Sequence, residues 1–184
     1  MISLLIGGVR AGKSSRALAI AEARPDDRPL LFVATAQAFD DEMRARIDAH
    51  QRERSSRWHT VESPIDVAVH LGAFISTHDV GAVVIDCITL WVSNILLTLP
   101  EDADAESVIS DRTRSLIECC RRISSSGTDV IIVTNEVGLG VVPPTPLGRR
   151  YRDALGRANQ LFAAAADEAT LLVAGLSLPL KVAS

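Results

Sequence analysis

The chain has 184 residues, 47% of them hydrophobic and 23% charged, which is typical of a soluble globular protein, and we expect one domain over residues 1–184. A net charge of −4 excludes proteins that bind nucleic acid or anionic membranes through a large positive field. An aromatic content of 4% also argues against single-strand binding by base stacking. The 3 cysteines lack C-x-x-C spacing, and neither a signal peptide nor a run of roughly 20 apolar residues is present, so we expect a cytoplasmic protein without zinc or a membrane span.

The first element is an apolar run at residues 2–6, which predicts a buried strand, and it leads directly into a loop of the form G-x-x-x-x-G-K-S. Glycines let backbone N–H groups turn toward an anion, and the helix that follows presents its positive end. Lys13 can reach the β- and γ-phosphates, and the Ser14 hydroxyl can bind Mg²⁺. An ordinary glycine turn is the alternative. We predict a triphosphate-binding loop made of Gly7, Gly8, Val9, Arg10, Ala11, Gly12, Lys13 and Ser14.

Strands and helices alternate along the rest of the chain. In order, the patterns predict a helix at 14–24, a strand at 30–34, a helix at 40–54, an extended link at 58–62, a helix at 64–74, a strand at 82–86, a short apolar helix at 90–97, a loop at 99–105, a helix at 108–123, a strand at 129–134, a loop at 135–146, a helix at 151–165, and strands at 170–174 and 178–182. This alternation is typical of a mostly parallel sheet with helices on both faces. We therefore predict an α/β fold of the P-loop NTPase type, similar to RecA.

A phosphate-binding loop does not identify a reaction, because its fold serves motors, switches and kinases. The segment 40–62 places several arginines around His50. A neutral imidazole is a competent nucleophile for phosphorus, and guanidinium groups stabilise charge on the phosphate under attack. The spacing alone leaves an alternative open, in which His50 completes an apolar helix face with Met43 and Ile47 while the arginines are solvated.

Two acidic residues follow strand ends, where α/β sheets place ligand contacts. Asp86 comes after four apolar residues, which favours a role toward Mg²⁺ or nucleotide over a simple turn. Glu136 is a candidate base or orienting group, with a loop-shaping role as the alternative. The remaining histidines, His59, His70 and His78, are expected to be surface or structurally satisfied residues.

Four segments carry a resemblance that covers nearly the whole chain: the loop at 7–14, the pattern at 40–62, the sequence Val-Thr-Asn-Glu-Val-Gly-Leu-Gly-Val-Val-Pro at 133–143, and the region 149–167 with Tyr-Arg-Asp and Gly-Arg-x-Asn-Gln. Together they resemble the bifunctional adenosylcobinamide kinase / adenosylcobinamide-phosphate guanylyltransferase family. The resemblance implies that the aminopropanol hydroxyl of adenosylcobinamide is phosphorylated with ATP or GTP. GMP is then transferred from GTP to the new phosphate through a guanylylated histidine, giving adenosylcobinamide-GDP in cobalamin biosynthesis.

The same resemblance implies roles for individual residues. The nucleophile carries over to His50, which follows Ala49 where some relatives have a second histidine. Mg²⁺ is the expected cofactor, with Ser14 and Asp86 as its ligands, although several relatives have glutamate in place of Asp86. A homotrimer is the expected assembly. Beyond the loop, the implied nucleotide contacts are Thr35, Ala36, Gln37, Gln51, Arg52, Glu53, Arg54, Glu62 and Asp86.

Three other classes of protein share part of this pattern. A GTPase switch is disfavoured because the chain lacks an N-K-x-D guanine motif, its lysines being Lys13 and Lys181. A RecA-like nucleic-acid ATPase is disfavoured by the acidic balance. A monofunctional P-loop kinase for a small molecule is the nearest alternative, and it differs by having no covalent histidine step.

Overall fold

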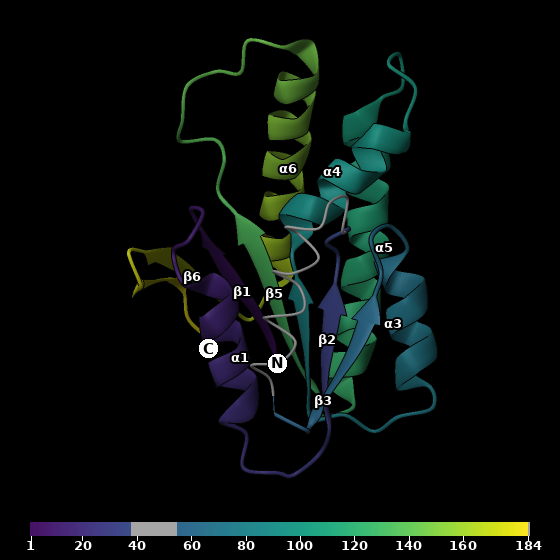
Figure 1. Ribbon diagram of the computed structural model, residues 1–184, viewed down its shortest axis with the longest axis vertical. Helices are drawn as coiled ribbons and strands as arrows, with labels where there is room; N and C mark the ends of the chain where they lie inside the picture. Colours follow the sequence, from purple (N-terminus) through teal and green to yellow (C-terminus); the bar gives the residue numbers. More distant parts are fainter. Residues whose placement is uncertain (38–54, 184) are drawn as a thin grey trace.

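A central sheet organises the molecule (Figure 1). The computed structural model describes residues 1–37 and 55–183, and within them the sheet has seven strands in the order β3-β2-β4-β5-β1-β6-β7. Neighbouring strands are parallel except for β6 and β7, which form an antiparallel hairpin. The strands are β1 (Ile2–Gly7), β2 (Leu30–Ala34), β3 (Trp58–Glu62), β4 (Ala82–Asp86), β5 (Asp129–Asn135), β6 (Glu168–Val173) and β7 (Leu176–Lys181).

Helices cover both faces of this sheet, as predicted (Figure 1). On one face, α1 (Lys13–Glu22) packs through Ala17 and Ala21. The opposite face is covered by α3 (Val67–Ile75), α4 (Ile88–Thr98), α5 (Ala105–Ser125) and α6 (Pro146–Ala165). Successive strand residues serve opposite faces, so Leu4 joins the larger core and Leu5 the smaller one. Because the inner strands are buried on both faces, they have the continuous apolar runs from which they were predicted.

Capping residues locate the starts of two helices more accurately than the apolar patterns do. Asp104 accepts a hydrogen bond from the Ser107 N–H and starts α5 earlier than expected. Thr145 does the same with the Gly148 N–H, so that α6 begins within the segment predicted as a loop. The helix expected at 40–54 lies outside the described residues. None of the described helices combines the length and the apolar character that crossing a bilayer requires.

The segment expected to be an extended link is a full strand, β3, at one edge of the sheet. It pairs in parallel with β2, with Leu30 opposite Trp58 and Ala34 opposite Glu62. The Trp58 ring packs edge-on against Phe32, with 6.3 Å between ring centroids, and its Nε1 donates to Glu22 at 2.8 Å. An edge strand buries less of its surface than an inner one, so its apolar signal was weak and the prediction of a link was wrong.

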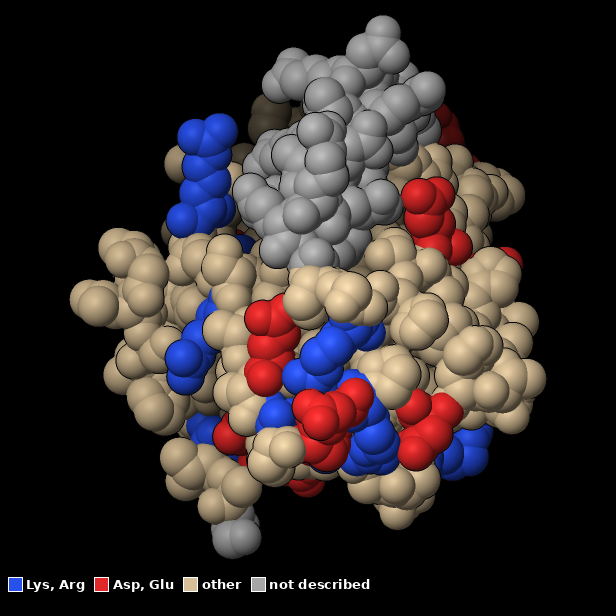
Figure 2. Space-filling model, turned by 60° about the horizontal axis from the view of Figure 1, so that its bottom comes forward, with Lys and Arg blue, Asp and Glu red and all other residues tan. Residues whose placement is uncertain are grey.

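The two ends of the parallel strands form two chemically different edges. The amino-terminal edge carries a network of ion pairs, in which Arg24 contacts Asp26 and Asp129 while Arg28 contacts Asp26 and Asp79. Figure 2, which brings this edge forward, shows basic and acidic side chains interleaved on it. The carboxyl-terminal edge instead collects the phosphate-binding loop and the ends of β2, β4 and β5, and the candidate site is there.

Candidate functional site

The phosphate-binding loop starts at a point where only glycine fits. Gly7 ends β1 and lies opposite Leu172 of β6. A Cβ atom built on Gly7 would be 2.2 Å from the Leu172 carbonyl oxygen, far inside contact distance. The absence of a side chain therefore lets β1 and β6 stay paired up to the residue where the loop begins.

The loop then curls through two residues with positive φ, Arg10 at 57° and Gly12 at 90°. The Ala11 N–H donates to the Gly8 carbonyl at 3.3 Å, and the Gly175 N–H donates to the Ala11 carbonyl at 3.2 Å. The second bond ties the loop to the turn of the β6–β7 hairpin. Alternation of right- and left-handed residues makes successive N–H groups face a common centre, which is the geometry that binds an anion.

Lys13 lies inside this curl. Its side chain is 7% exposed, and its Nζ donates to the Gly8 carbonyl at 2.6 Å. Burial lowers the pKa of Lys13, and Cys87 and Asp86 act in the opposite direction. Because burial also raises the pKa of the Cys87 thiol to about 11, that thiol is neutral at pH 7 and Asp86 is the opposing charge. A buried ammonium of this kind is stabilised when a phosphate binds beside it.

The amino-terminal end of α1 is open to the same anion. Within residues 1–37 and 55–183, no side chain caps this helix, and its first turn contains no acidic residue. Its unpaired N–H groups and its dipole therefore both favour a phosphate at this point.

Mg²⁺ fits the donor set beside the loop, although through few protein ligands. Ser14 is half-buried in the first turn of α1, and Asp86 is half-buried at the end of β4, close enough for its charge to be felt at Lys13. Hydroxyl and carboxylate oxygens are the hard ligands that Mg²⁺ prefers. The described part of the chain holds no cluster of three or more His, Cys, Asp or Glu side chains suited to a metal.

Thr35 has a structural task at the end of β2. It is fully buried, its Oγ1 donates to the Cys87 carbonyl and accepts from the Cys87 N–H, each at 2.7 Å, and its own N–H donates to the Asp86 carbonyl at 3.1 Å. These bonds join β2 to the point where the chain leaves β4. Of the three residues predicted here as nucleotide contacts, Ala36 and Gln37 are half-exposed, and their contact with a ligand stays a prediction.

The other predicted contacts divide into two groups. Glu62 is exposed at the end of β3, in register with Ala34, and so lies at the same edge of the sheet. His50, Gln51, Arg52, Glu53 and Arg54 lie outside the described residues, and their roles stay predictions.

Two buried asparagine side chains hold the strand ends of the site in place through hydrogen bonds, and the sequence analysis did not predict them. Asn94 on α4 is 7% exposed, and its Nδ2 donates to the carbonyls of Thr35 at 2.8 Å and Pro64 at 3.0 Å. Asn159 on α6 accepts from Thr134 at 2.8 Å and donates to the Asn135 carbonyl at 3.0 Å. Each one fixes a strand end where the loops of the site begin. The available signal was an amide on the buried face of an otherwise apolar helix pattern.

Glu136 shapes the loop that follows β5. Its carboxylate accepts a hydrogen bond from the Gly138 N–H, and its own N–H donates to the Gly7 carbonyl at 3.2 Å. The first bond favours the loop-shaping alternative for this side chain, and the second ties the loop to the base of the phosphate site.

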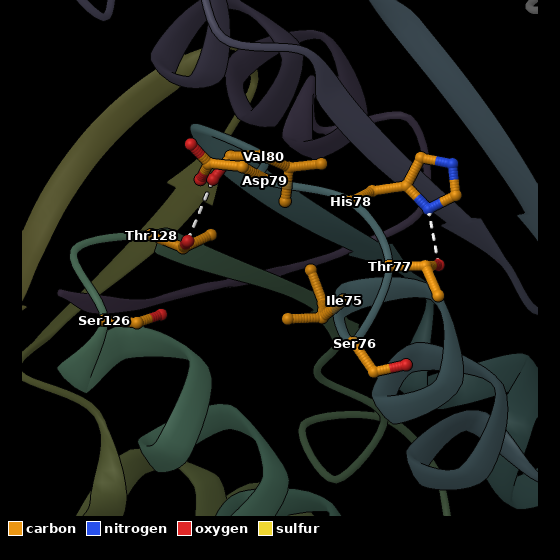
Figure 3. Close-up of a pocket in the computed structure, with 8 residues that line it drawn as sticks. All are labelled: Ile75, Ser76, Thr77, His78, Asp79, Val80, Ser126 and Thr128. Carbon is orange, nitrogen blue, oxygen red and sulfur yellow. Dashed lines mark hydrogen bonds between the residues drawn. The ribbon is translucent and has the colours of Figure 1, made fainter.

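A pocket of about 280 Å³ lies elsewhere, at the amino-terminal edge of the sheet (Figure 3). It is lined by residues 75–80 with Ser126 and Thr128. Polar groups in it already bond to one another: Thr128 donates to the Val80 carbonyl at 2.9 Å, and Thr77 lies 2.9 Å from Nδ1 of His78. It contains none of the predicted site residues.

Comparison with known proteins identifies relatives that cover nearly the whole chain. The model of the family described as "Cobinamide kinase / cobinamide phosphate guanyltransferase" matches residues 3–180. "Bifunctional adenosylcobalamin biosynthesis protein CobU" of Escherichia coli K12 is 39% identical over 191 residues, covering 98% of this chain and 100% of the relative. The protein of the same name from Salmonella typhimurium is 40% identical, again with 98% and 100% coverage. "Bifunctional adenosylcobalamin biosynthesis protein CobP" of Pseudomonas aeruginosa is 38% identical and covers 98% of each chain.

Solved structures with a similar fold are more distant in sequence. The flagellar accessory protein FlaH from Methanocaldococcus jannaschii superposes with a TM-score of 0.58 at 12% identity, covering 99% of this chain and 78% of that one. A second solved structure, an ATPase domain, gives a TM-score of 0.56 at 14% identity, with 94% and 69% coverage. At these identities the likeness concerns the fold alone, and it confirms the predicted P-loop NTPase architecture.

Proposed function

Because the chain belongs to the cobinamide kinase / cobinamide phosphate guanyltransferase family, we propose that it phosphorylates adenosylcobinamide and then transfers GMP from GTP to the phosphate so formed. It is a bifunctional enzyme, a kinase and a guanylyltransferase, of cobalamin biosynthesis. The observation that carries the proposal is the curled loop with the buried Lys13 ammonium inside it, in a chain that matches this family over residues 3–180.

For the kinase step, the loop amides and Lys13 hold the triphosphate of ATP or GTP in line with the substrate hydroxyl. The hydroxyl oxygen forms a bond to the γ-phosphorus, the bond to the β,γ-bridging oxygen breaks, the nucleoside diphosphate leaves and the hydroxyl proton is released. Ser14 and Asp86 would hold Mg²⁺, which when bound neutralises phosphate charge. The contribution of the chain is position and positive potential, supplied by the loop, Lys13 and the end of α1.

For the transferase step, His50 is the proposed nucleophile. An imidazole nitrogen bonds to the α-phosphorus of GTP and pyrophosphate leaves; a cobinamide phosphate oxygen then attacks the same phosphorus and the nitrogen–phosphorus bond breaks. Two steps avoid assembling three anionic groups in one transition state, and they predict ping-pong kinetics. This role is supported by the position of His50 among arginines in the sequence and by the family to which the chain belongs.

The test uses the acid lability of a phosphoramidate. Protein incubated with Mg²⁺ and GTP labelled at the α-phosphorus should retain the label in alkali and lose it in acid. His50→Ala should abolish labelling while γ-phosphoryl transfer to cobinamide remains measurable, and His59→Ala, at an exposed position of β3, should leave both unchanged. Absence of label on the unaltered protein would refute the histidine step and leave the monofunctional kinase or a RecA-like ATPase. Loss of both activities in His50→Ala would make His50 structural.

We further propose a homotrimer. The β6–β7 hairpin supports self-association, because Leu176, Leu178 and Leu180 alternate along β7 and each is more than half exposed. Sedimentation equilibrium that returned the mass of a monomer would contradict the trimer.

The proposed location is the cytoplasm. Cys87, Cys119 and Cys120 are free thiols, and two of them are buried, which agrees with a reducing compartment. Fractionation of cells that found the protein outside the cytoplasm would contradict this location.

A further inference from the structure

The loop between β5 and α6 exposes apolar side chains beside the phosphate site. Val141 is 94% exposed, Leu139 88% and Val142 59%, and Leu147 in the first turn of α6 is 48% exposed. In Figure 1 this segment rises beyond the carboxyl-terminal edge of the sheet, alongside α6. Apolar side chains gathered at this level of exposure usually mark a contact surface rather than a random feature of a protein surface. We call residues 137–147 the apolar loop.

Hydrogen bonds hold the apolar loop in place at both ends. At its start, Val137 packs against the larger core, and the Glu136 carboxylate accepts from the Gly138 N–H. At its end, Nη1 of Arg149 donates to the carbonyls of Pro143 at 3.1 Å and Pro144 at 2.8 Å. Fixed ends and adjacent prolines limit the shapes that the loop can adopt. The loop therefore holds its apolar side chains exposed before a ligand binds. This preorganisation lowers the conformational entropy that the loop loses when a ligand covers them.

The loop also has a fixed relation to the chemistry. It leaves the sheet through Glu136, whose N–H donates to the Gly7 carbonyl at 3.2 Å, directly before the curl that surrounds Lys13. The start of the apolar loop therefore lies next to the base of the phosphate-binding loop. The exposed leucines of the β6–β7 hairpin form a separate surface on a strand edge, which is the kind of surface that pairs with another chain.

We propose that Leu139, Val141, Val142 and Leu147 form the contact surface for the corrin ring of the substrate, an inference that rests on the proposed function. Cobinamide joins a broad macrocycle, rich in methyl groups, to a flexible arm that ends in the reacting hydroxyl. The ring is far larger than the curl around Lys13 and needs apolar contact outside it, while the arm must reach inward to the γ-phosphate. The apolar loop meets both requirements, since it is apolar, exposed and joined to the base of the phosphate site.

A matched pair of double variants tests this assignment. Leu139→Ser with Val141→Ser removes one leucine and one valine from the loop, and Val69→Ser with Leu97→Ser removes the same residue types from exposed positions on α3 and α4, where they are 67% and 65% exposed. Equilibrium dialysis measures the binding of cobinamide, which absorbs visible light. Kinase assays give KM for cobinamide and for the nucleotide, and labelling with α-labelled GTP in the absence of cobinamide reports the nucleotide site alone.

The loop variant should bind cobinamide roughly tenfold more weakly and show a matching rise in its KM, because it loses apolar area that the ring would cover. The KM for nucleotide and the labelling by GTP should stay within about twofold, and the control variant should resemble the unaltered protein in every assay. Unchanged cobinamide binding in a loop variant of an active enzyme would overturn the inference and leave the proposed function intact. If the loop variant has a lower sedimentation mass and binds both substrates more weakly, the apolar loop is instead an interface between copies of the chain, and the inference is overturned. Failure of the unaltered protein to phosphorylate cobinamide would refute both proposals.

Discussion

Replacing Gly7 by alanine should separate β1 from β6 and destabilise the fold. The added Cβ would lie 2.2 Å from the Leu172 carbonyl oxygen, whereas ordinary contacts start at 3.4 Å, so the two strands must move apart by about 1 Å. The obstacle is backbone within a paired strand and cannot rotate away. Overpacking costs roughly 1–3 kcal/mol, and we expect a loss near the upper end, about 3 kcal/mol, in the free energy of unfolding.

Gly8 provides the matched control one residue further along the loop. A Cβ there meets nothing within 4 Å among the described residues, so Gly8→Ala should leave stability nearly unchanged. Both variants restrict the unfolded chain to the same extent, and the difference between them isolates the contact with Leu172. Urea unfolding, followed by the fluorescence of Trp58 and the buried Trp91, should place the midpoint of Gly7→Ala roughly 1–2 M below that of Gly8→Ala. Equal midpoints would refute the steric explanation for the glycine at position 7.

Two further predictions concern single side chains. Asn94→Leu keeps the branched shape of the side chain but leaves the buried carbonyls of Thr35 and Pro64 without their donor. It should therefore cost about 2–3 kcal/mol of unfolding free energy and raise the KM for nucleotide. Ser93→Ala on the same helix should change stability by less than about 0.5 kcal/mol, and equal losses would contradict a specific role for the amide. The hydrogen bonds of Asp26 with Arg24, and then with Arg28, lower its pKa to about 2, so this carboxylate stabilises the fold above its unfolded pKa near 4, and that contribution is lost as pH falls toward 2. In urea titrations, the difference in unfolding free energy between the unaltered protein and Asp26→Asn should therefore become smaller between pH 5 and pH 2. A difference that does not depend on pH would contradict this role of the Asp26 carboxylate. The same narrowing for the exposed Asp27→Asn would also contradict it.

The structure keeps the residues of the predicted phosphate-binding loop together because they are neighbours in sequence, and their contacts with nucleotide stay predictions. A phosphate-binding loop is a contiguous stretch, and its glycines, Lys13 and Ser14 stand at fixed spacing between a strand and a helix. The same is true of the inner strands, whose continuous apolar runs reflect burial on both faces. The sequence by itself therefore determined the fold class and the family resemblance that the comparisons confirmed, and it gave the position of the candidate nucleotide loop as a prediction.

Only the tertiary structure revealed contacts between distant parts of the chain. The edge strand β3 is held by its pairing with β2, and the antiparallel direction of β7 depends on the turn after β6. The roles of Asn94 and Thr35 arise from hydrogen bonds to residues far away in sequence, which no local pattern encodes. Gly7 needs to be glycine because of Leu172, a residue that reaches it only when the sheet is assembled. Spacing along the chain determines what lies on one loop or one helix face, whereas packing between elements determines which side chains are free to act and which hold the site in place.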